Sequence, residues 1–393
     1  MKDIPHNNLE RPFEYLRRKA TGQKFEASVV RNWYIARAFL LDRLSHFALA
    51  PSDDAHLNIV LLGDSPLVLS LARQAALQSH YLNFDEKTGA NRTLITIVSS
   101  NPHIVDELKK EEYLCHLLDY SKLTIGAEVA NCNSFVDIEF EIKSQWAEED
   151  VQPYSACRSG GHTVHRYVFG EDDVNSFCKS MPEERIFTID TRKARYASRM
   201  YDLGAEINNL PYEDIHSVKR YALALDVYQY GKLKEKAERF VNKKWEDIEN
   251  QQEVLLGVFN IFCSDCFMIR YNSLKPCWEG DRKSRRQVWE DHYDALSKSE
   301  HSRWVVEKLI LGYLPYDQQD HLLDESLAAC PRERSRRRHL LKNNWTGPRH
   351  IDLCSFDDLR RIDPDNMKYD SFLVLGIPQI LNEVGELEDG CHD

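Results

Sequence analysis

The sequence has no long uninterrupted hydrophobic run, so it predicts no membrane-spanning helix. The most apolar early segment, WYIARAFLLDRLSHFALA (33–50), is interrupted by four ionisable residues: Arg37, Asp42, Arg43 and His46. Because it is too short and too charged to cross a bilayer, we expect an amphipathic packing helix. The first twenty residues are polar and charged from the first turn, which does not fit a secretory signal peptide. We therefore expect no membrane insertion.

Disulfide and zinc patterns are also missing. The ten cysteines are scattered along the chain, so we expect reduced thiols and a cytoplasmic location. The pair CSDC (263–266) has the spacing of two zinc ligands, but no second Cys-x-x-Cys follows it. Cys157, His162 and His165 form only a loose cluster. Since structural zinc requires four ligands at regular spacing, we expect buried or unreactive thiols and no metal site.

Catalytic motifs are absent as well. We find no nucleophile elbow, no phosphate-binding lysine loop and no paired-carboxylate motif. The acidic stretches 170–173 and 356–358 lie beside turns, where carboxylates usually act as solvated caps. The sequence therefore gives little support to an enzymatic activity.

The composition is that of a folded globular protein. The chain has 393 residues, of which 42% are hydrophobic and 10% aromatic, enough for two or three domains. Its net charge is −12 at pH 7. Because such a chain repels nucleic acid overall, we expect no direct nucleic-acid binding, and any anionic ligand requires a local basic pocket.

Strand and helix patterns alternate through the first half of the chain. Buried strands are predicted at 57–63 and 92–100, each followed by a helix, at 64–77 and 101–114. Further strands are predicted at 134–144, 162–170 and 184–190. This alternation predicts an α/β fold with a Rossmann-like, doubly wound parallel sheet. We divide the chain into a helical segment (1–50), the Rossmann-like domain (51–230), a helical connector (231–286) and a mainly helical C-terminal domain (287–393).

The turn after the first predicted strand is where a Rossmann sheet binds a pyrophosphate. The three glycine positions of that motif are occupied by Gly63, Ser65 and Val68, so only the first glycine is present. The second predicted strand ends in Ser99-Ser100, without the acidic residue that binds a ribose. Two interpretations remain open: a weak nucleotide site formed by Gly63, Asp64, Ser65 and Ser99, or a retained scaffold without ligand. The lost glycines argue against catalytic NAD chemistry.

One predicted helix, within ALSKSEHSRWVVEKLILGYLPY (295–316), carries an unusual mixture of side chains. His301, Trp304 and Lys308 lie on one stripe at helical spacing. Arg303 and Glu307 are predicted to face water. Gly312 ends the pattern as a C-terminal cap, with Tyr313 directly after it.

Two basic clusters contrast with the acidic total. They are RKSRR (282–286), in a predicted linker, and RERSRRR (332–338), in a predicted loop. Both a solvated loop and an anion-binding role are compatible with these arginines.

The C-terminal third resembles the RyR domain, the small helical module of ryanodine receptors that also occurs in bacterial proteins. The resemblance lies in a helix of the form E-H-x-x-W-x-x-x-K-x-x-x-G-aromatic, here Glu300, His301, Trp304, Lys308, Gly312 and Tyr313. Later come Arg349-His350, IDLCSFDDL (351–359) and Lys368-Tyr369-Asp370 before the last predicted helix. The match covers about 100 residues. It departs from the family in Tyr313, where tryptophan is usual, and in a longer segment (314–348) between its halves.

The resemblance implies a nucleotide-binding pocket in which bases stack on aromatic residues. Trp304 or Tyr313 would stack a purine, Lys308 and Arg349 would meet phosphates, and His350 would bind the base or ribose. The alternative is that His301 and Trp304 are core residues. In bacteria the module often follows a Rossmann-like, NAD-binding domain similar to those of potassium-transport regulators, and such proteins are suspected of sensing nucleotide signals in antiviral defence.

These observations favour a cytoplasmic, prokaryotic-type, non-catalytic sensor that binds a nucleotide-derived small molecule, with no certain cofactor, as a homodimer. One alternative class is an enzyme, either NAD(P)-dependent or nucleotide-cleaving. Another is a regulatory subunit of an ion channel or transporter.

Overall fold

The computed structural model describes residues 47–132, 134–145, 162–170, 186–188, 285–344, 347–367 and 370. It also describes parts of two helical segments: residues 32, 33, 36, 37, 39, 40 and 44 of the first, and residues 266, 269, 270 and 272–277 of the second.

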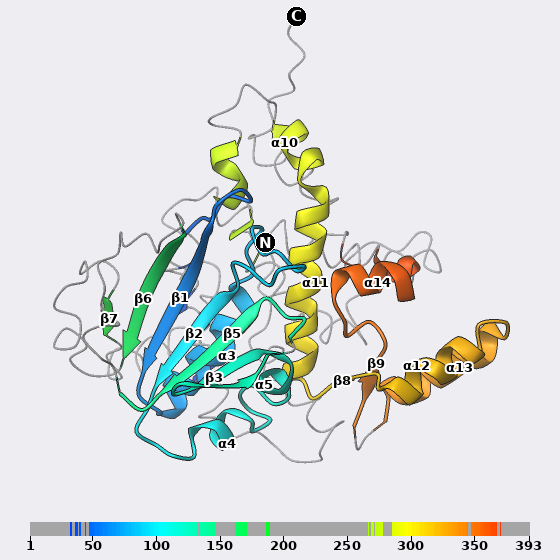
Figure 1. Ribbon diagram of the computed structural model, residues 1–393, viewed down its shortest axis with the longest axis horizontal. Helices are drawn as coiled ribbons and strands as arrows, with labels where there is room; N and C mark the ends of the chain where they lie inside the picture. The colour runs from blue at the N-terminus through cyan, green and yellow to red at the C-terminus, as the bar shows by residue number, and fades with distance from the viewer. Residues whose placement is uncertain are drawn as a thin grey trace, which may run out of the picture.

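A seven-stranded sheet forms the body of the molecule (Figure 1). In chain order its strands are β1 (Ala55–Leu62), β2 (Thr93–Val98), β3 (Lys122–Ile125), β4 (Glu128–Asn131), β5 (Ile138–Lys143), β6 (Thr163–Gly170) and β7 (Ile186–Thr188). Their order across the sheet is β4-β3-β5-β2-β1-β6-β7. All neighbouring pairs are parallel except β3 with β4. The predicted α/β class with a mostly parallel sheet is confirmed, and the order around β1 agrees with a Rossmann-like sheet.

The first strand and helix follow their sequence signals closely. β1 is an almost continuous run of buried apolar residues, as expected of a strand covered on both faces. The helix α3 (Pro66–Gln78) begins where predicted, with Pro66 in its first turn and the Ser65 hydroxyl accepting a hydrogen bond from the Val68 amide.

The structure differs from the sequence prediction in two places. The helix predicted at 101–114 is shorter, because only α4 (Ile104–Leu108) is regular before a series of turns leads to α5 (Leu117–Tyr120). The hairpin β3–β4 was not predicted, because its strands have four residues each, too few to show an alternating pattern.

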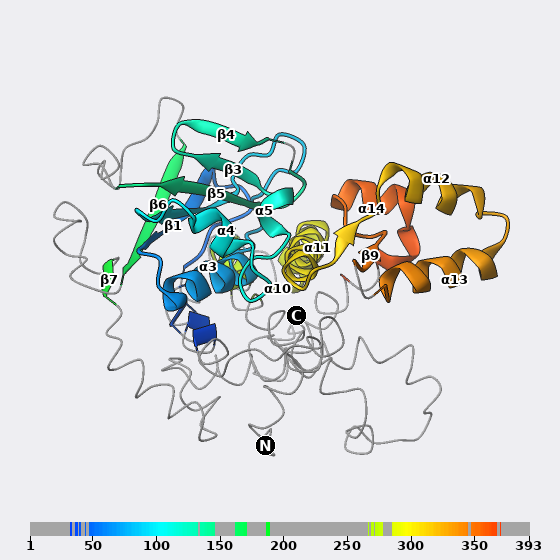
Figure 2. The ribbon, with the colours of Figure 1, turned by 90° about the horizontal axis from the view of Figure 1, so that it is seen from below.

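The C-terminal part is mainly helical. It contains α10 (Arg285–Asp291), α11 (Tyr293–Ile310), α12 (Gln318–Ser326), α13 (Pro331–Lys342), α14 (Phe356–Ile362) and the short 3-10 helix η5 (Pro364–Asn366). Two short parallel strands, β8 (Leu314–Pro315) and β9 (Arg349–His350), bring the ends of this region together. Figure 2 shows α12, α13 and α14 on the far side of α11 from the sheet.

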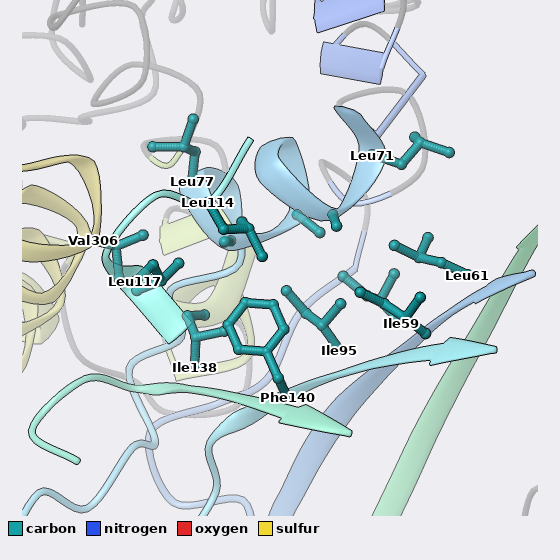
Figure 3. Close-up of a cluster of buried hydrophobic side chains, with 14 of the residues drawn as sticks. Ile59, Leu61, Leu71, Leu77, Ile95, Leu114, Leu117, Ile138, Phe140 and Val306 are labelled. Atoms are coloured by element: carbon teal, nitrogen blue, oxygen red, sulfur yellow. The ribbon is translucent and has the colours of Figure 1, made fainter. Parts of the chain in front are cut away.

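The long helix α11 belongs to the same hydrophobic core as the sheet. Val305, Val306, Leu309 and Ile310 are buried in one cluster with residues of the strands and of α3. Figure 3 shows Val306 beside Leu117 of α5 at one end of this cluster. The helix that opens the predicted RyR segment is thus packed against the α/β part and holds the C-terminal helices next to it.

The predicted amphipathic helix near the N-terminus agrees with the described positions. Trp33, Ala36, Leu40 and Leu44 are helical and buried, at the spacing of one helix face. The domain boundaries stay predictions, since residues 189–265 lie outside the described part of the chain. Among the described residues, no helix is both long enough and apolar enough to cross a membrane.

Candidate functional site

The end of α11 places Tyr313 against Lys308. Gly312 has a φ of +84°, a left-handed conformation that glycine adopts without steric cost. The Gly312 amide donates to the Leu309 carbonyl (3.2 Å) and the Tyr313 amide to the Lys308 carbonyl (3.0 Å). These two hydrogen bonds define a Schellman motif, which brings the residue after the glycine back over the last helical turn. The predicted cap at Gly312 is confirmed.

An aromatic cluster, which we define as Trp304, Lys308, Tyr313 and His350, surrounds this helix end. The Lys308 ammonium lies 5.8 Å from the ring centroids of both Trp304 and Tyr313, within cation–π range. The His350 ring meets Trp304 edge-on, with centroids 5.0 Å apart. Trp304 and Tyr313 are half-buried. Four of the residues predicted to bind a ligand are therefore brought together.

His301 supports this cluster from the interior. It is 2% exposed, and its ring stacks on Trp304 at a centroid distance of 5.9 Å. Its Nδ1 bonds to Asp370 Oδ2 (3.1 Å) and its Nε2 to the Cys354 carbonyl (2.9 Å). Burial alone would lower the pKa of His301, but the Asp370 carboxylate and the Cys354 hydrogen bond outweigh it and raise this pKa well above its usual value. His301 is an imidazolium with an acceptor at each nitrogen, which agrees with the core interpretation of this residue.

Arg349 lies beside the cluster but is held by carboxylates. Its guanidinium pairs with Asp317, and with Asp320 at 2.6 Å. Asp317 is also the N-cap of α12, accepting from the Asp320 amide, so the arginine connects β9 to that helix. A phosphate at Arg349 would have to compete with these two carboxylates.

Arg303 and Glu307 were predicted to face water, and this prediction was wrong. Arg303 is 0% and Glu307 2% exposed. Arg303 Nε donates to both oxygens of Glu300 (3.1 Å each) and its Nη1 to Glu307 Oε2 (2.5 Å). Burial would raise the pKa of Glu307, but the charges of Lys308 and Arg303 lower it. The face of α11 that carries Glu300, Arg303 and Glu307 therefore forms a buried ion-pair network. It is covered by other parts of the chain, as is the apolar face of this helix.

The arginine run 332–338 was predicted to be a loop, and this also was wrong. It lies in α13, and the 314–348 segment folds as the two helices α12 and α13 with short connections. Arg334 and Arg338 both bind Asp324, at 2.7 and 2.8 Å, and Arg337 binds Asp320 at 2.6 Å. Three of the five arginines in this run thus join the two helices.

Asp352 is a charged neighbour of the cluster that the sequence did not single out. Its Oδ2 accepts from Asn366 (2.8 Å), whereas its buried Oδ1 has no hydrogen-bond partner among the described residues. Burial and the nearby Asp363 raise the pKa of Asp352 to about 6. The Asp352 backbone amide donates to His350 Nδ1 (3.3 Å). Because Nδ1 accepts this hydrogen bond, a neutral His350 ring carries its proton on Nε2. No pattern in the sequence marks an aspartate that folding will bury.

The turn between β1 and α3 forms the second candidate site. It lies where the chain changes direction across the sheet, between β1 and β6, the usual ligand crevice of such folds. Gly63 has a φ of +110° and bonds to the Val98 carbonyl. The Asp64 carboxylate accepts a hydrogen bond from the Ser99 hydroxyl (3.0 Å). The predicted residues do meet, but they present a carboxylate where a phosphate would bind.

The predicted thiol clusters fall partly outside the described residues, because Cys157 and Cys263 are not among them. The six described cysteines, Cys115, Cys132, Cys266, Cys277, Cys330 and Cys354, form no disulfide with one another. Within the described ranges no group of three or more histidine, cysteine or acidic side chains has the geometry of a metal site.

Comparison with known proteins found no matching family model, no similar curated protein and no similar solved structure.

Proposed function

We propose that the protein is a non-catalytic sensor that binds a nucleotide-derived small molecule at the aromatic cluster. The observation that carries this proposal is the position of the Lys308 ammonium, 5.8 Å from the centroids of both Trp304 and Tyr313. Two half-buried rings beside one cation offer a stacking surface for a base. The Lys308 ammonium, which pairs with Glu307 at 2.8 Å, offers a positive charge that an anionic group could share. The resemblance to RyR modules supports the same assignment.

The aromatic cluster has two cations beside it, Lys308 and Arg349, each paired with carboxylates, whereas the β1–α3 turn presents a carboxylate that is paired with a hydroxyl. At the β1–α3 turn the Asp64 carboxylate would repel a phosphate. Beside the cluster, Arg349 already binds two carboxylates, so a phosphate there would exchange one anionic partner for another. Such an exchange would loosen the connection between β9 and α12, and this gives ligand binding a structural consequence. Dimer formation is a further part of the proposal, and so is a role in prokaryotic antiviral signalling, which rests on the resemblance.

Mass spectrometry of small molecules that co-purify with the protein identifies a natural ligand. Calorimetric titration with adenosine, AMP and ADP then measures binding. We expect Tyr313→Ala to weaken binding by about 1–3 kcal/mol, the usual contribution of one stacked base. Arg349→Ala should weaken AMP and ADP more than adenosine, because adenosine carries no phosphate.

Matched controls are available on the same chain. Tyr293 lies at the opposite end of α11 and is 38% exposed, so Tyr293→Ala should bind like the parent. Arg361 pairs with Asp358 on the surface of α14, and Arg361→Ala should also leave binding unchanged. If Tyr313→Ala and Arg349→Ala melt cooperatively and still bind like the parent, the aromatic cluster is not the site, and the turn at Gly63–Ser65 becomes the leading candidate.

A further inference from the structure

The hairpin formed by the helices α12 and α13 is attached to the rest of the molecule with little apolar burial. The buried residues of α12 are two aspartates, Asp320 and Asp324, and α13 has no buried residue. Neither helix contributes a described side chain to the hydrophobic cluster of the sheet and α11. Both overall views show the hairpin on the far side of α11 from the sheet (Figures 1 and 2). Because apolar packing is what usually fixes a short helix in a protein, the position of this hairpin depends mainly on polar contacts.

Ion pairs hold the two helices of the hairpin against each other. Asp324 of α12 binds Arg334 and Arg338 of α13, at 2.7 and 2.8 Å. Asp320 of α12 binds Arg337 of α13 at 2.6 Å. Because these pairs connect α12 with α13, they keep the hairpin together as one unit wherever it lies.

Other contacts connect the hairpin to its surroundings. At its root β8 pairs with β9, and Arg349 of β9 binds Asp317 and Asp320 at the start of α12. A second connection lies to the side of the hairpin, where Arg338 pairs with Asp363, directly after α14. The side chains of this pair are 23% and 12% exposed, so salt screens it only in part. The lateral pair therefore holds the hairpin against the segment that follows α14.

Asp363 also connects the hairpin to the aromatic cluster. The side-chain amide of Asn366 donates to Asp363 (3.3 Å) and to Asp352 (2.8 Å). The backbone amide of Asp352 in turn donates to Nδ1 of His350, a member of the cluster (3.3 Å). Burial and the charge of Asp363 raise the pKa of Asp352, whereas the charge of Arg338 lowers it. The lateral pair therefore sets the charge that Asp352 meets behind the cluster.

We propose that the α12–α13 hairpin is a regulatory arm that docks through the Arg338–Asp363 pair and thereby controls the position of His350 in the aromatic cluster. In the docked state Arg338 balances the charge of Asp363. When the arm leaves, Asp363 loses this counter-charge and competes with Asp352 for the amide of Asn366. Because the helices of the arm bury no apolar side chain, the arm can leave without unfolding the core. The regulatory role rests on the proposed function, whereas docking can be measured without a ligand.

Hydrogen–deuterium exchange of the full-length protein, with mass spectrometry of its peptides, tests the docking. Asp363→Asn keeps the shape of the side chain and removes the charge that Arg338 binds. Because α12 and α13 have 9 and 12 residues, lengths at which an isolated helix is marginal in water, an undocked hairpin should exchange faster. We expect exchange in residues 318–342 to rise about 3-fold or more, with no change in α3. The matched control is Asp365→Asn, because Asp365 is exposed and lies two residues away.

A second pair of variants tests the connection to the aromatic cluster. Arg334 and Arg338 both bind Asp324, and of these two arginines Arg338 also binds Asp363. Arg338→Gln should therefore speed exchange in residues 349–354, which include the Asp352 amide, by about 3-fold or more. Arg334→Gln, which loses the same pair with Asp324, should leave this segment unchanged.

The proposed docking is overturned if Asp363→Asn leaves exchange in residues 318–342 unchanged, or if Asp365→Asn raises it equally. Equal exchange of residues 349–354 in Arg338→Gln and Arg334→Gln would overturn the regulatory role and would leave the proposed ligand site untouched. If Asp363→Asn melts earlier than the parent, the parent in about 50 and 500 mM NaCl replaces it, because salt weakens a partly exposed pair. Exchange in the hairpin should then rise with salt while that of α3 stays constant, and a hairpin that does not respond to salt would also overturn the docking.

Discussion

Replacing Arg303 with methionine tests whether the buried network on α11 is a single electrostatic unit. Arg303 is fully buried and holds Glu300 and Glu307 through four hydrogen bonds, all of 3.1 Å or less. Methionine fills much of the volume but removes the charge. After the substitution Glu300 keeps its pair with Arg270, at 3.0 Å, and Glu307 keeps its pair with Lys308, at 2.8 Å.

Removing one partner of a buried ion pair typically costs about 3–5 kcal/mol, because the other charge remains buried without compensation. Each glutamate here retains one cation, so we expect the lower end, about 3 kcal/mol. A loss of this size is a large fraction of the stability of an ordinary domain. It should appear as a clear fall in the urea midpoint, with an unchanged dependence on denaturant.

The control is Arg361→Met. Like Arg303, Arg361 pairs with an acidic residue at i−3, here Asp358, but its side chain is 75% exposed, and exposed pairs contribute little to stability. We expect its urea midpoint to equal that of the parent. If Arg303→Met unfolds at the same urea concentration as this control, the network does not stabilise the fold and the reasoning from burial is refuted.

Three further predictions concern single residues. Because the pKa of His301 is raised in the folded state, its pair with Asp370 stabilises the fold fully below about pH 6.5, and this contribution is lost as the pH rises through the folded pKa. The stability difference between the parent and His301→Gln should therefore shrink in alkaline buffer. A constant difference from pH 6 to 10 would contradict this. Gly312→Ala should cost about 1–2 kcal/mol in urea unfolding because an alanine is strained at a φ of +84°, whereas unchanged stability would mean that the turn rearranges. Burial raises the pKa of the Cys115 thiol to about 11, so peptide mapping after alkylation at pH 8 should find the exposed Cys330 modified well before Cys115, and equal rates would contradict this burial.

The absence of nicotinamide chemistry is also testable. Two of the three motif glycines are missing after β1, where Ser65 and Val68 stand instead. We expect no oxidation of NADPH or reduction of NADP⁺ with a broad panel of carbonyl and alcohol substrates. Turnover above background would make the sensor proposal wrong in favour of an oxidoreductase.

Local signals in the sequence were enough to predict the parallel strands and the ends of two helices. The apolar run 59–62 of β1 lies in a covered sheet, and Ser65, Pro66 and Gly312 act on hydrogen bonds within a few residues of themselves. For the same reason the proximity of Trp304, Lys308 and Tyr313 could be expected, since all three lie within ten residues on one helix and its cap.

The sequence by itself determined which segments are helix and strand where the stabilising contacts are local. Tertiary structure decided which faces are covered. The polar face of α11 is buried by other parts of the chain, and Arg270, some 30 residues earlier in the chain, supplies a charge to Glu300 there. The helix α13 has no buried residue, and its ion pairs reach aspartates 10 to 25 residues away. Contacts between distant segments leave no periodic pattern, so only the folded chain shows that these charges are paired.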